Sequence, residues 1–529
     1  MGLTALDIVV FLAFFGIVIG VSMFKSRREK TGEDFFLASR GLFWPMIGLS
    51  LIAANISTEH FVGMAGQGAG IAGMAIASYE WMAAIVLVFV AMFFLPKFLK
   101  TGIFTIPEYL EYRYNPTARA IMAIFTMFIY VLVTISTVIY SGGLTLQTLF
   151  GDLNNSTHLL YGIITISAIA AVYTGWGGLK AVAWADLFQG SALIIGGAIT
   201  MVLGFKAIGV TEFFETNQDR MHMILDKDHP VLPWTALVIG LWIPNFYYWG
   251  LNQYISQRTL AAKTLRQGQL GVIFAAGLKL IIPFIIIFPG IMSLQLYGDQ
   301  MTGESGSDAA YPLLIRNLVG PGVRAFIFAA ISGAVISSLA SMLNSASTIF
   351  TMDIYKRHIK KDVSERNIIL TGRTSTFIFV IIGAVIAYML QSFPTGIFTY
   401  IQEFQGFISP GVLAAFVFGF TVKRAPRSAG AAALIVNFVV YGLLLILYSG
   451  YGVFDKLGVT MGEIAFLNRM AVSFIVVLAV MTAMTIIKPL AEPRKLPVKE
   501  DFDMKPTPSV LWLGIVVIVI TLVLYGIFW

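Results

Sequence analysis

The sequence contains no cysteine among its 529 residues, so it forms no disulfide, uses no thiol nucleophile and holds no metal through thiolates. Histidine is scarce as well, because the five histidines are scattered and none has the spacing of a zinc site. There is no phosphate-binding loop of the P-loop type, and Gly66, Gly68 and Gly70 lie in an apolar segment rather than after a strand. We therefore expect neither nucleotide hydrolysis nor an enzyme of any recognisable kind.

Charged residues are also rare, at 12 % of the chain, whereas hydrophobic residues make up 57 %. Soluble domains carry about 25 % charged residues and about 45–50 % apolar ones. Segments of about 20 apolar residues, the length that crosses a bilayer, recur along the chain. They predict an all-α polytopic membrane protein with about fourteen transmembrane helices. These lie near 5–24, 43–70, 75–96, 120–150, 157–176, 181–205, 231–255, 270–296, 322–350, 370–391, 396–421, 428–449, 465–487 and 508–528.

The positive charges follow a pattern along the chain. Most of the 35 Lys and Arg residues lie in loops after odd-numbered segments, with clusters at 25–40, 258–266 and 356–373. The positive-inside rule places these loops in the cytoplasm and both the N- and the C-terminus outside. The net charge of +7 thus reflects membrane orientation rather than nucleic-acid binding. We expect a multi-pass protein of the plasma membrane, and the short loops are typical of a bacterial inner membrane.

Polar residues interrupt the second segment, which reads SLIAANISTEHFVGMAGQG between Ser50 and Gly68. Ionisable side chains in hydrocarbon are costly and rarely face lipid. The glycines allow the helix to break, and unwound backbone at membrane depth is tolerated where it lines a cavity. In the seventh segment, Pro244 and Gly250 bracket a polar and aromatic stretch. Together the two segments predict that something polar binds halfway across the bilayer.

Isolated polar residues occur in other segments too. A lone charge at mid-span costs about 2.5–3.5 kcal/mol, which favours a functional role for Glu80 and Lys279. Asp186 lies near the cytoplasmic start of its segment, where a structural cap or an ion pair is at least as good an interpretation. The hydroxyls of the ninth segment, including Ser337 and Ser341, share one helical face, and alone they favour interhelical packing.

These polar positions share one chemistry. Asn, Gln, Glu, His and Lys offer donors and acceptors for paired hydroxyls, and the interleaved Tyr, Phe and Trp suit the apolar face of a sugar ring. An anionic solute would instead call for arginine or for helix N-termini. We expect no arginine in the membrane core. The pattern therefore favours a polyhydroxylated ligand over a carboxylate.

Six blocks of sequence together resemble a known family. They are SLIAANISTEHFVGMAG at 50–66, ASYEWM at 77–82, GGLKAV at 177–182, NFYYWGLNQYISQRTLAAK at 245–263, SSLASMLNSASTIFTMDIYK at 337–356 and YIQEFQGFISPG at 400–411. Over essentially its whole length the chain resembles the sodium/solute symporter family, and within it the sodium–glucose/galactose cotransporter branch. The resemblance implies a LeuT-type core of two five-helix repeats with inverted topology, each beginning with a broken helix.

The same resemblance implies one transmembrane transporter domain over residues 1–529. Residues 1–40 would form the first peripheral helix and a cytoplasmic loop. The first inverted repeat would span 43–205 and the second 231–421. Residues 422–529 would add three C-terminal peripheral helices.

The family's functional residues carry over position by position. The sodium site maps to the backbone carbonyls of Ala53, Ile56 and Ala334 and to the hydroxyls of Ser337 and Ser338. Asp186 falls where the family has an acidic residue linked to sodium exit. The sugar site maps to Asn55, His60, Glu80, Asn245, Lys279 and Gln402. Tyr248 resembles the inner gate, and Met64, Tyr79 and Phe398 resemble the outer gate. Sodium is the expected coupling ion, with no organic cofactor.

The sequence departs from parts of the family at the sugar pocket. His60 stands where some bacterial galactose carriers have Gln, Ala83 lacks a serine of some relatives, and Thr399 replaces an acidic residue of animal members. None of these differences touches the sodium site. They leave the identity of the solute more open than the coupling to sodium.

The resemblance implies sodium-driven symport of a galactose- or glucose-like monosaccharide into the cell by alternating access. The same machine carrying inositol, sialic acid, an amino acid or a carboxylate is the nearest alternative. A sugar-gated sensor or channel is a second, and an accessory subunit of an enzyme or receptor is a third. The expected partners are sodium, a small solute and the bilayer, without nucleic acid, in a monomer or weak homodimer.

Overall fold

The protein is described from a computed structural model, which covers residues 4–26, 31–57, 59–150, 156–301, 307–390, 397–448, 464–500, 502–505 and 507–529. Helices dominate this part of the chain, and its only β-type pairing is one isolated bridge between Leu42 and Ala262. Ten helical stretches within it are long and apolar enough to cross a membrane. The predicted all-α polytopic membrane architecture is thereby confirmed.

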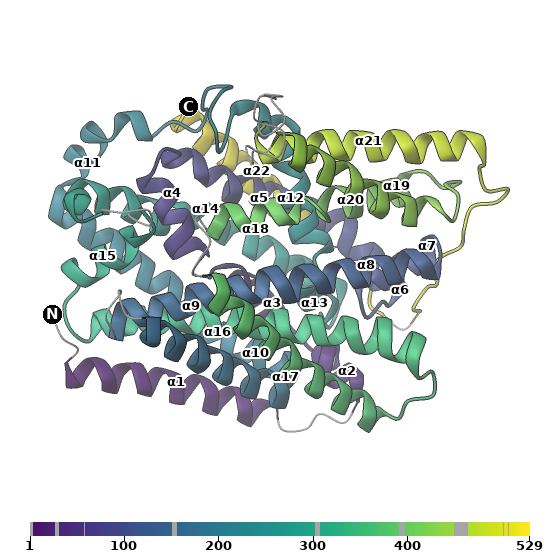
Figure 1. Cartoon of the computed structure of the whole chain (residues 1–529), viewed down its shortest axis with the longest axis horizontal. Coiled ribbons are helices and arrows are strands. Elements are labelled where there is room, and N and C mark those ends of the chain that lie inside the picture. The colour runs from purple at the N-terminus through teal and green to yellow at the C-terminus, as the bar shows by residue number, and fades with distance from the viewer. Residues whose placement is uncertain are drawn as a thin grey trace.

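Most long helices run along the longest axis of the molecule (Figure 1). The long helices are α1 (Ala5–Lys25), α8 (Pro116–Phe128) continuing into α9 (Ile135–Phe150), α10 (Ser156–Ile208), α14 (Leu265–Tyr297), α16 (Val323–Ile349), α17 (Glu365–Met389), α20 (Ala429–Tyr448), α21 (Phe466–Ile487) and α22 (Pro508–Ile527). Shorter elements connect or extend them: α2 (Gly32–Leu37), α5 (Ser78–Phe89), α6 (Leu95–Thr101), α7 (Ile106–Arg113), α11 (Val210–Thr216) and α15 (Ala310–Leu318).

Three predicted segments are helical but broken. Segment 43–70 divides into α3 (Trp44–Asn55), a π-helical turn at Glu59–Met64 and α4 (Ala65–Ala69). Segment 231–255 divides into α12 (Trp242–Phe246), a π-helical turn at Tyr247–Leu251 and α13 (Gln253–Leu260). Segment 396–421 divides into α18 (Ile397–Gln405) and α19 (Ser409–Thr421). Since each piece is short, none of these segments counts among the ten long spans.

The first two breaks have the same backbone geometry. Ile56 follows α3 with φ −75° and ψ 109°, and Asn252 precedes α13 with φ −78° and ψ 125°. Both conformations are extended, so the helical hydrogen-bond ladder stops there and leaves backbone groups free for other partners. The second break falls just beyond Gly250, not at Pro244, which lies within α12.

One predicted loop is instead a sharp bend inside α10. Segments 157–176 and 181–205 belong to this single element, which is interrupted at Gly178 with φ 51° and ψ −163°. A positive φ of this kind is adopted readily only by glycine. The bend therefore turns the chain back without a separate loop.

Burial locates the centre of the bundle. Nearly all side chains of α16 are buried, whereas α1, α20, α21 and α22 bury only a minority of theirs. The outer helices expose large aliphatic side chains such as Leu12, Val439 and Leu522, as expected for surfaces that face lipid. The core therefore lies around α16, and α1 and α20–α22 are peripheral.

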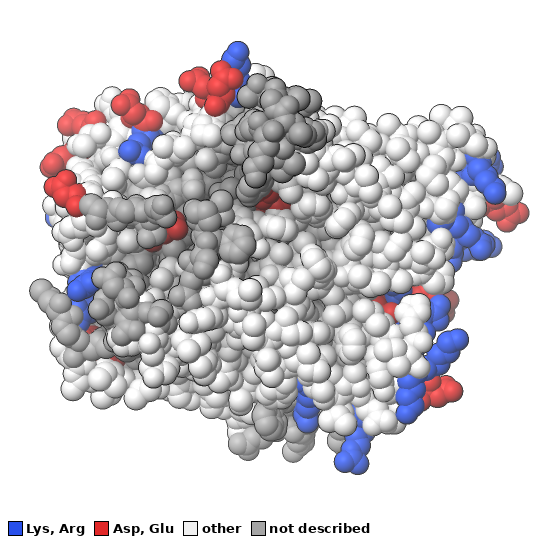
Figure 2. Space-filling model, in the orientation of Figure 1, with Lys and Arg blue, Asp and Glu red and all other residues white. Residues whose placement is uncertain are grey.

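The two ends of the molecule differ in the charged residues that they carry. On the face shown in Figure 2, Lys and Arg gather at one end of the long axis and Asp and Glu are frequent at the other, with an almost uncharged band between. Both chain ends lie toward the end opposite the basic one (Figure 1). This arrangement matches the charge bias that the positive-inside rule uses.

Candidate functional site

A polar cavity lies where the broken helices meet. It has a volume of about 50 Å³, enough for a few water molecules. Its lining comes from α3 and its π-helical turn, α5, the α12 region and α18. The lining residues are Asn55, Glu59, His60, Met64, Tyr79, Glu80, Pro244, Asn245, Tyr248, Trp249, Gln402 and Gln405. Five of the six predicted sugar ligands and three of the four predicted gate residues are therefore brought together in one place.

The sixth predicted ligand, Lys279, sits beside this cavity and organises it. Its side chain is fully buried, and Nζ donates to Asn55 Oδ1 and forms an ion pair with Glu80. The other oxygen of Glu80 lies 3.3 Å from His60 Nε2. Lys279 Nζ also lies 4.8 Å from the centre of the Trp249 ring, a cation–π distance. The two mid-membrane charges thus compensate each other, which lowers the cost of burying them.

Tyr248 connects the cavity to α13. Asn55 Nδ2 donates to the Tyr248 hydroxyl at 3.0 Å, and the Tyr254 hydroxyl lies 2.5 Å from it. The ring packs edge-on against Trp249 and Tyr254, with centroids 5.2 and 5.6 Å apart. Tyr248 therefore forms part of the cavity wall and is hydrogen-bonded to Asn55, a predicted sugar ligand.

The remaining predicted residues differ in how they are placed. Met64, Tyr79 and Gln402 face the cavity, whereas the Asn245 amide also donates to the Leu241 carbonyl of its own helix at 3.0 Å. The side chain of Phe398 lies outside the described residues. Gln405 also lines the cavity, although the family resemblance assigned it no role there. Gln405 lies three residues after Gln402 on α18, and this spacing of about one helical turn could have predicted that both side chains face the same cavity.

Two of the predicted sodium ligands, Ala53 and Ser338, meet between α3 and α16. The Ser338 hydroxyl donates to the carbonyls of Ala54 and Ala53, at 3.0 and 3.3 Å. Those carbonyls belong to the last turn of α3, where helical partners are missing and the helix dipole is negative. Ala334, Ser337 and Ser338 are buried on α16 and share a face by their i, i+3 and i+4 spacing. Carbonyl and hydroxyl oxygens of this kind suit a small hard cation.

Asp186 belongs to a buried ion pair next to these residues. Its carboxylate accepts hydrogen bonds from Ser337 and Ser50, and Arg258 Nη2 lies 3.1 Å from Oδ2. Arg258 also donates to Ser50 Oγ at 2.6 Å and to Ser341. The structural interpretation of Asp186 as an ion-pair partner is thus what the geometry shows. Ser337 is part of the same hydrogen-bonded cluster.

The expectation of a membrane core without arginine is wrong. Arg258, counted among the cytoplasmic loop residues, is completely buried on α13. The sequence does not reveal this, because a buried arginine is tolerated only through partners that come from distant segments. Its partners Ser50, Asp186 and Ser341 lie on three other elements.

The candidate site holds no cluster typical of a transition metal. Within the described ranges, no group of three or more His, Asp or Glu side chains is placed to bind a metal ion.

Comparisons with known proteins identify the family of the chain. Residues 35–436 match the model of the sodium:solute symporter family. A sodium/glucose cotransporter of Vibrio parahaemolyticus is 42 % identical over 473 residues, covering 84 % of this chain and 86 % of the relative. The mouse sodium/myo-inositol cotransporter 2 is 34 % identical, covering 83 % of this chain and 70 % of the relative.

A solved structure shares the fold. A Na⁺-coupled sialic acid symporter in a substrate-bound, outward-open state matches with a TM-score of 0.79. The match covers 93 % of this chain and 99 % of that one, at 22 % sequence identity. At this identity the similarity speaks for the architecture only.

Proposed function

This chain belongs to the sodium:solute symporter family, and on that basis we propose that it carries a galactose- or glucose-like monosaccharide into the cell together with sodium. Sodium-coupled solute symport follows from the family. The choice of a monosaccharide rests on the cavity and on the similarity to a sodium/glucose cotransporter.

The observation that carries the proposal is the polar cavity with its buried Lys279–Glu80 ion pair. Lys279 and Glu80 neutralise each other, and Asn55, His60 and Gln402 add uncharged or titratable donors and acceptors. A neutral ligand with several hydroxyls can replace these hydrogen bonds without leaving a net charge buried. Arg258 is paired with Asp186, and neither it nor any other buried arginine lines the cavity, so the lining offers no arginine as an anchor for a carboxylate.

Sodium would bind between α3 and α16. We assign it to the carbonyls of Ala53, Ile56 and Ala334 and to the hydroxyls of Ser337 and Ser338. Sodium at that position would bridge the end of a broken helix to the most buried helix of the bundle. Asp186 hydrogen-bonds to Ser337 and would influence sodium release toward the cytoplasm.

The transport cycle would proceed by alternating access in a LeuT-type core. We propose fourteen spans, with inverted repeats at 43–205 and 231–421, a peripheral helix and loop at 1–40 and three peripheral helices at 422–529. A cavity of about 50 Å³ is far below the roughly 300–1,000 Å³ of ligand pockets, so helices or gates must move to admit a sugar. Tyr248 would serve as the inner gate. Met64, Tyr79 and Phe398 would close the outer one.

Sodium binding would drive the cycle because it favours one conformation over the other. One positive charge moving inward gains about 2.3 kcal/mol per 100 mV. A tenfold sodium gradient adds about 1.4 kcal/mol. With one sodium per sugar the total of about 3.7 kcal/mol supports a several-hundredfold accumulation. A reversal potential that corresponds to two charges per sugar would contradict this ratio.

The membrane orientation follows from the charge distribution. We propose a bacterial inner-membrane protein, working as a monomer or weak homodimer, with the basic end in the cytoplasm and both termini outside. The relevant observation is that the basic end lies opposite both chain ends.

The experiment that tests the function is uptake into proteoliposomes. Labelled galactose and glucose are offered under an inward sodium gradient, then under a matched potassium gradient, with and without an inside-negative potential. We expect accumulation that requires sodium and increases with the potential. Current or sodium flux without sugar accumulation would contradict symport and favour a sugar-gated sensor or channel.

A cyclic polyol is the second candidate solute. The mouse sodium/myo-inositol cotransporter 2 is similar over 83 % of this chain, and a polyol offers hydroxyls like those of a sugar. Competition decides between them. Inhibition of labelled galactose uptake by excess myo-inositol but not by excess glucose would favour the polyol.

A further inference from the structure

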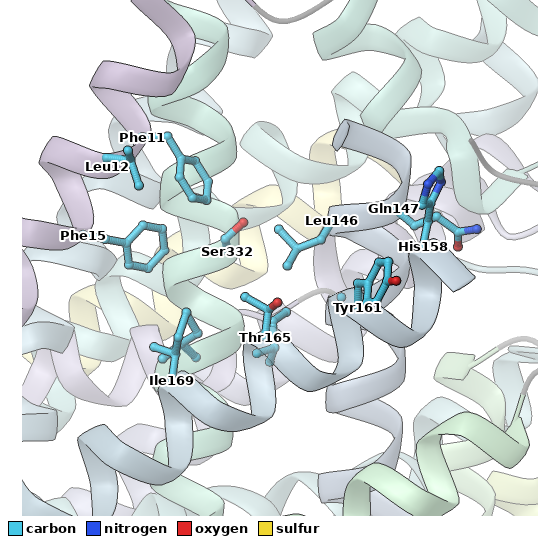
Figure 3. A pocket seen from close by; sticks show the side chains of 13 residues that line it. Phe11, Leu12, Phe15, Leu146, Gln147, His158, Tyr161, Thr165, Ile169 and Ser332 are labelled. Atoms are coloured by element: carbon cyan, nitrogen blue, oxygen red, sulfur yellow. The ribbon is translucent and has the colours of Figure 1, made fainter. Parts of the chain in front are cut away.

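A second cavity, which shares no lining residue with the polar one, lies between α1, α9, α10 and α16 (Figure 3). Its volume is about 480 Å³, which is within the range of ligand pockets. Most of its wall is apolar, with Phe11 and Phe15 from α1, Leu146 from α9, and Ile166 and Ile169 from α10. Such a wall suits an apolar ligand better than a sugar, which needs hydrogen-bonding partners along its whole length.

The cavity opens toward the surface that faces lipid. Two of its lining residues are largely exposed, Leu12 at 64 % and Tyr161 at 61 %. Leu12 lies on α1, which is a candidate membrane span, and Tyr161 lies in the apolar first part of α10. Whatever fills the cavity therefore enters from the bilayer. Apolar cavities do not hold water well, and an empty one forfeits dispersion contacts, so a hydrocarbon chain is the natural occupant.

Three of the five polar lining residues gather at one end. Figure 3 shows Gln147, His158 and Tyr161 together on one side, and Phe11 and Phe15 on the other. His158 and Tyr161 lie in the first two turns of α10, where the chain enters the membrane. From His158 to Ile169 the helix rises by about 16 Å. The cavity is thus elongated, with a polar mouth and an apolar interior.

One buried hydroxyl lacks a protein partner in this cavity. Ser332 of α16 is 3 % exposed, and its Oγ has no hydrogen-bond partner within the described part of the chain. Ser332 lines the cavity and appears near its centre in Figure 3. A buried hydroxyl without a partner is costly, so an acceptor supplied by a ligand would stabilise it. Such an acceptor is available in the ester carbonyl of a phospholipid.

We propose that this cavity binds one acyl chain of a membrane phospholipid. The chain would lie between α1 and α10, its ester group near Ser332 and its headgroup at the mouth formed by Gln147, His158 and Tyr161. The gradient from polar mouth to apolar interior matches the gradient within a phospholipid molecule. Under the proposed membrane orientation the lipid comes from the outer leaflet.

The lipid would contact the helix on which sodium coupling is proposed to depend. Ile336, another lining residue, immediately precedes Ser337 on α16. An acyl chain in the cavity also fills the space between this core helix and the peripheral helix α1. The proposed lipid is therefore a structural link between the periphery and the centre of the bundle.

Photolabelling tests the proposal without requiring transport. The purified full-length protein is reconstituted in nanodiscs that contain phosphatidylcholine with a diazirine in one acyl chain, irradiated, digested and mapped by mass spectrometry. We expect labelling concentrated in the α1 and α10 peptides that contain Phe11–Phe15 and Tyr161–Ile169, reduced by excess unlabelled phosphatidylcholine. Labelling spread evenly over all lipid-facing helices would overturn the proposal.

Matched variants distinguish the cavity from ordinary lipid contact. Thr165 lines the cavity and is exposed, whereas Ala168 is exposed on the same helix but does not line it. Thr165→Phe should reduce the labelling of α1 severalfold, and Ala168→Phe should leave it unchanged. Leu12→Trp and Val9→Trp make the same comparison on α1, where only Leu12 lines the cavity. Each variant must elute as a monodisperse protein. Equal labelling in both members of each pair would overturn the site.

Competition identifies the occupant. Phosphatidylcholine should displace the photolabel at lower mole fractions than a free fatty acid or cholesterol does. Displacement by cholesterol or fatty acid alone would overturn the assignment to a phospholipid.

Discussion

Single residues decide how a charge can lie in the middle of this membrane protein. Lys279 and Glu80 occupy different helices, and each reduces the cost of burying the other. Asn55 connects this pair to Tyr248, so the predicted substrate residues and the predicted inner gate share one hydrogen-bond network. A ligand that engages Asn55 would therefore also affect the residue that closes the cavity.

Gln402 provides the first test at this scale. Gln402→Ala should abolish monosaccharide uptake while sodium binding persists, because Gln402 lines the cavity and no described contact connects it to α16. Labelled sugar uptake and calorimetric titration with sodium measure the two effects separately. A variant that loses both would show that Gln402 supports the fold or the sodium site instead.

Ser338 provides the complementary test. Ser338→Ala removes one proposed hydroxyl ligand, and a hydrogen bond or ligand contact to a charged group contributes about 1.5–3 kcal/mol. The sodium concentration for half-maximal uptake should rise by about one to two orders of magnitude. Ser347→Ala is the control, because Ser347 is buried on the same helix and bonds only the Asn344 carbonyl at 2.9 Å. Equal shifts in both variants would argue against a ligand role for Ser338.

At the scale of elements, broken helices bring the site together. The ends of α3 and the start of α13 supply backbone groups that a continuous helix would have used internally. Arg258 holds four elements in register, since it lies on α13 and bonds Ser50 of α3, Asp186 of α10 and Ser341 of α16. The buried guanidinium of Arg258 therefore holds together the elements around the proposed sodium site.

Removing the Arg258 side chain should destabilise the protein strongly. Arg258→Ala leaves Asp186 buried without its partner, which costs about 3–5 kcal/mol. Thermal unfolding in detergent, followed by the loss of the monodisperse size-exclusion peak, should occur at a clearly lower temperature. The matched control is Arg266→Ala, because Arg266 is exposed a few residues further on. Similar unfolding temperatures for Arg258→Ala and the unmodified protein would contradict the proposed role of the ion pair.

At the scale of the whole molecule, charge and hydrophobicity determine how the bundle sits in a membrane. On the face shown in Figure 2, an almost uncharged band separates the basic end from the opposite end, toward which both termini lie. This distribution of charge is a property of all the helices together, because each helix is joined to only one connecting segment at each end of the molecule. The peripheral helices provide most of the lipid-facing surface, and α16 is shielded from it.

Labelling of introduced thiols tests the orientation. The chain has no cysteine, so single-cysteine variants carry no background. In right-side-out cells, Asp228→Cys should react with a membrane-impermeant maleimide, and Lys361→Cys should react only after permeabilisation. Both positions are exposed. The reverse pattern would place the termini in the cytoplasm.

The sequence by itself determined the class of protein, because long apolar runs and a biased distribution of Lys and Arg leave few alternatives to a polytopic helical membrane protein. It also indicated the broken helices, since polar residues and glycines at membrane depth are tolerated only where the backbone lines a cavity. Glu80 and Lys279 were singled out for the same reason. The cost of an isolated charge is visible from one segment alone.

Only the tertiary structure decided which polar groups meet. Asp186 and Arg258 are 72 residues apart, and the sequence placed the arginine in a loop, whereas packing pairs them inside the bundle. The position of the second break beyond Gly250, the merging of two predicted segments into α10 and the apolar cavity beside α1 also depend on contacts between distant elements. The energy of a buried polar group is set by its partners, and the partners of these groups come from other helices.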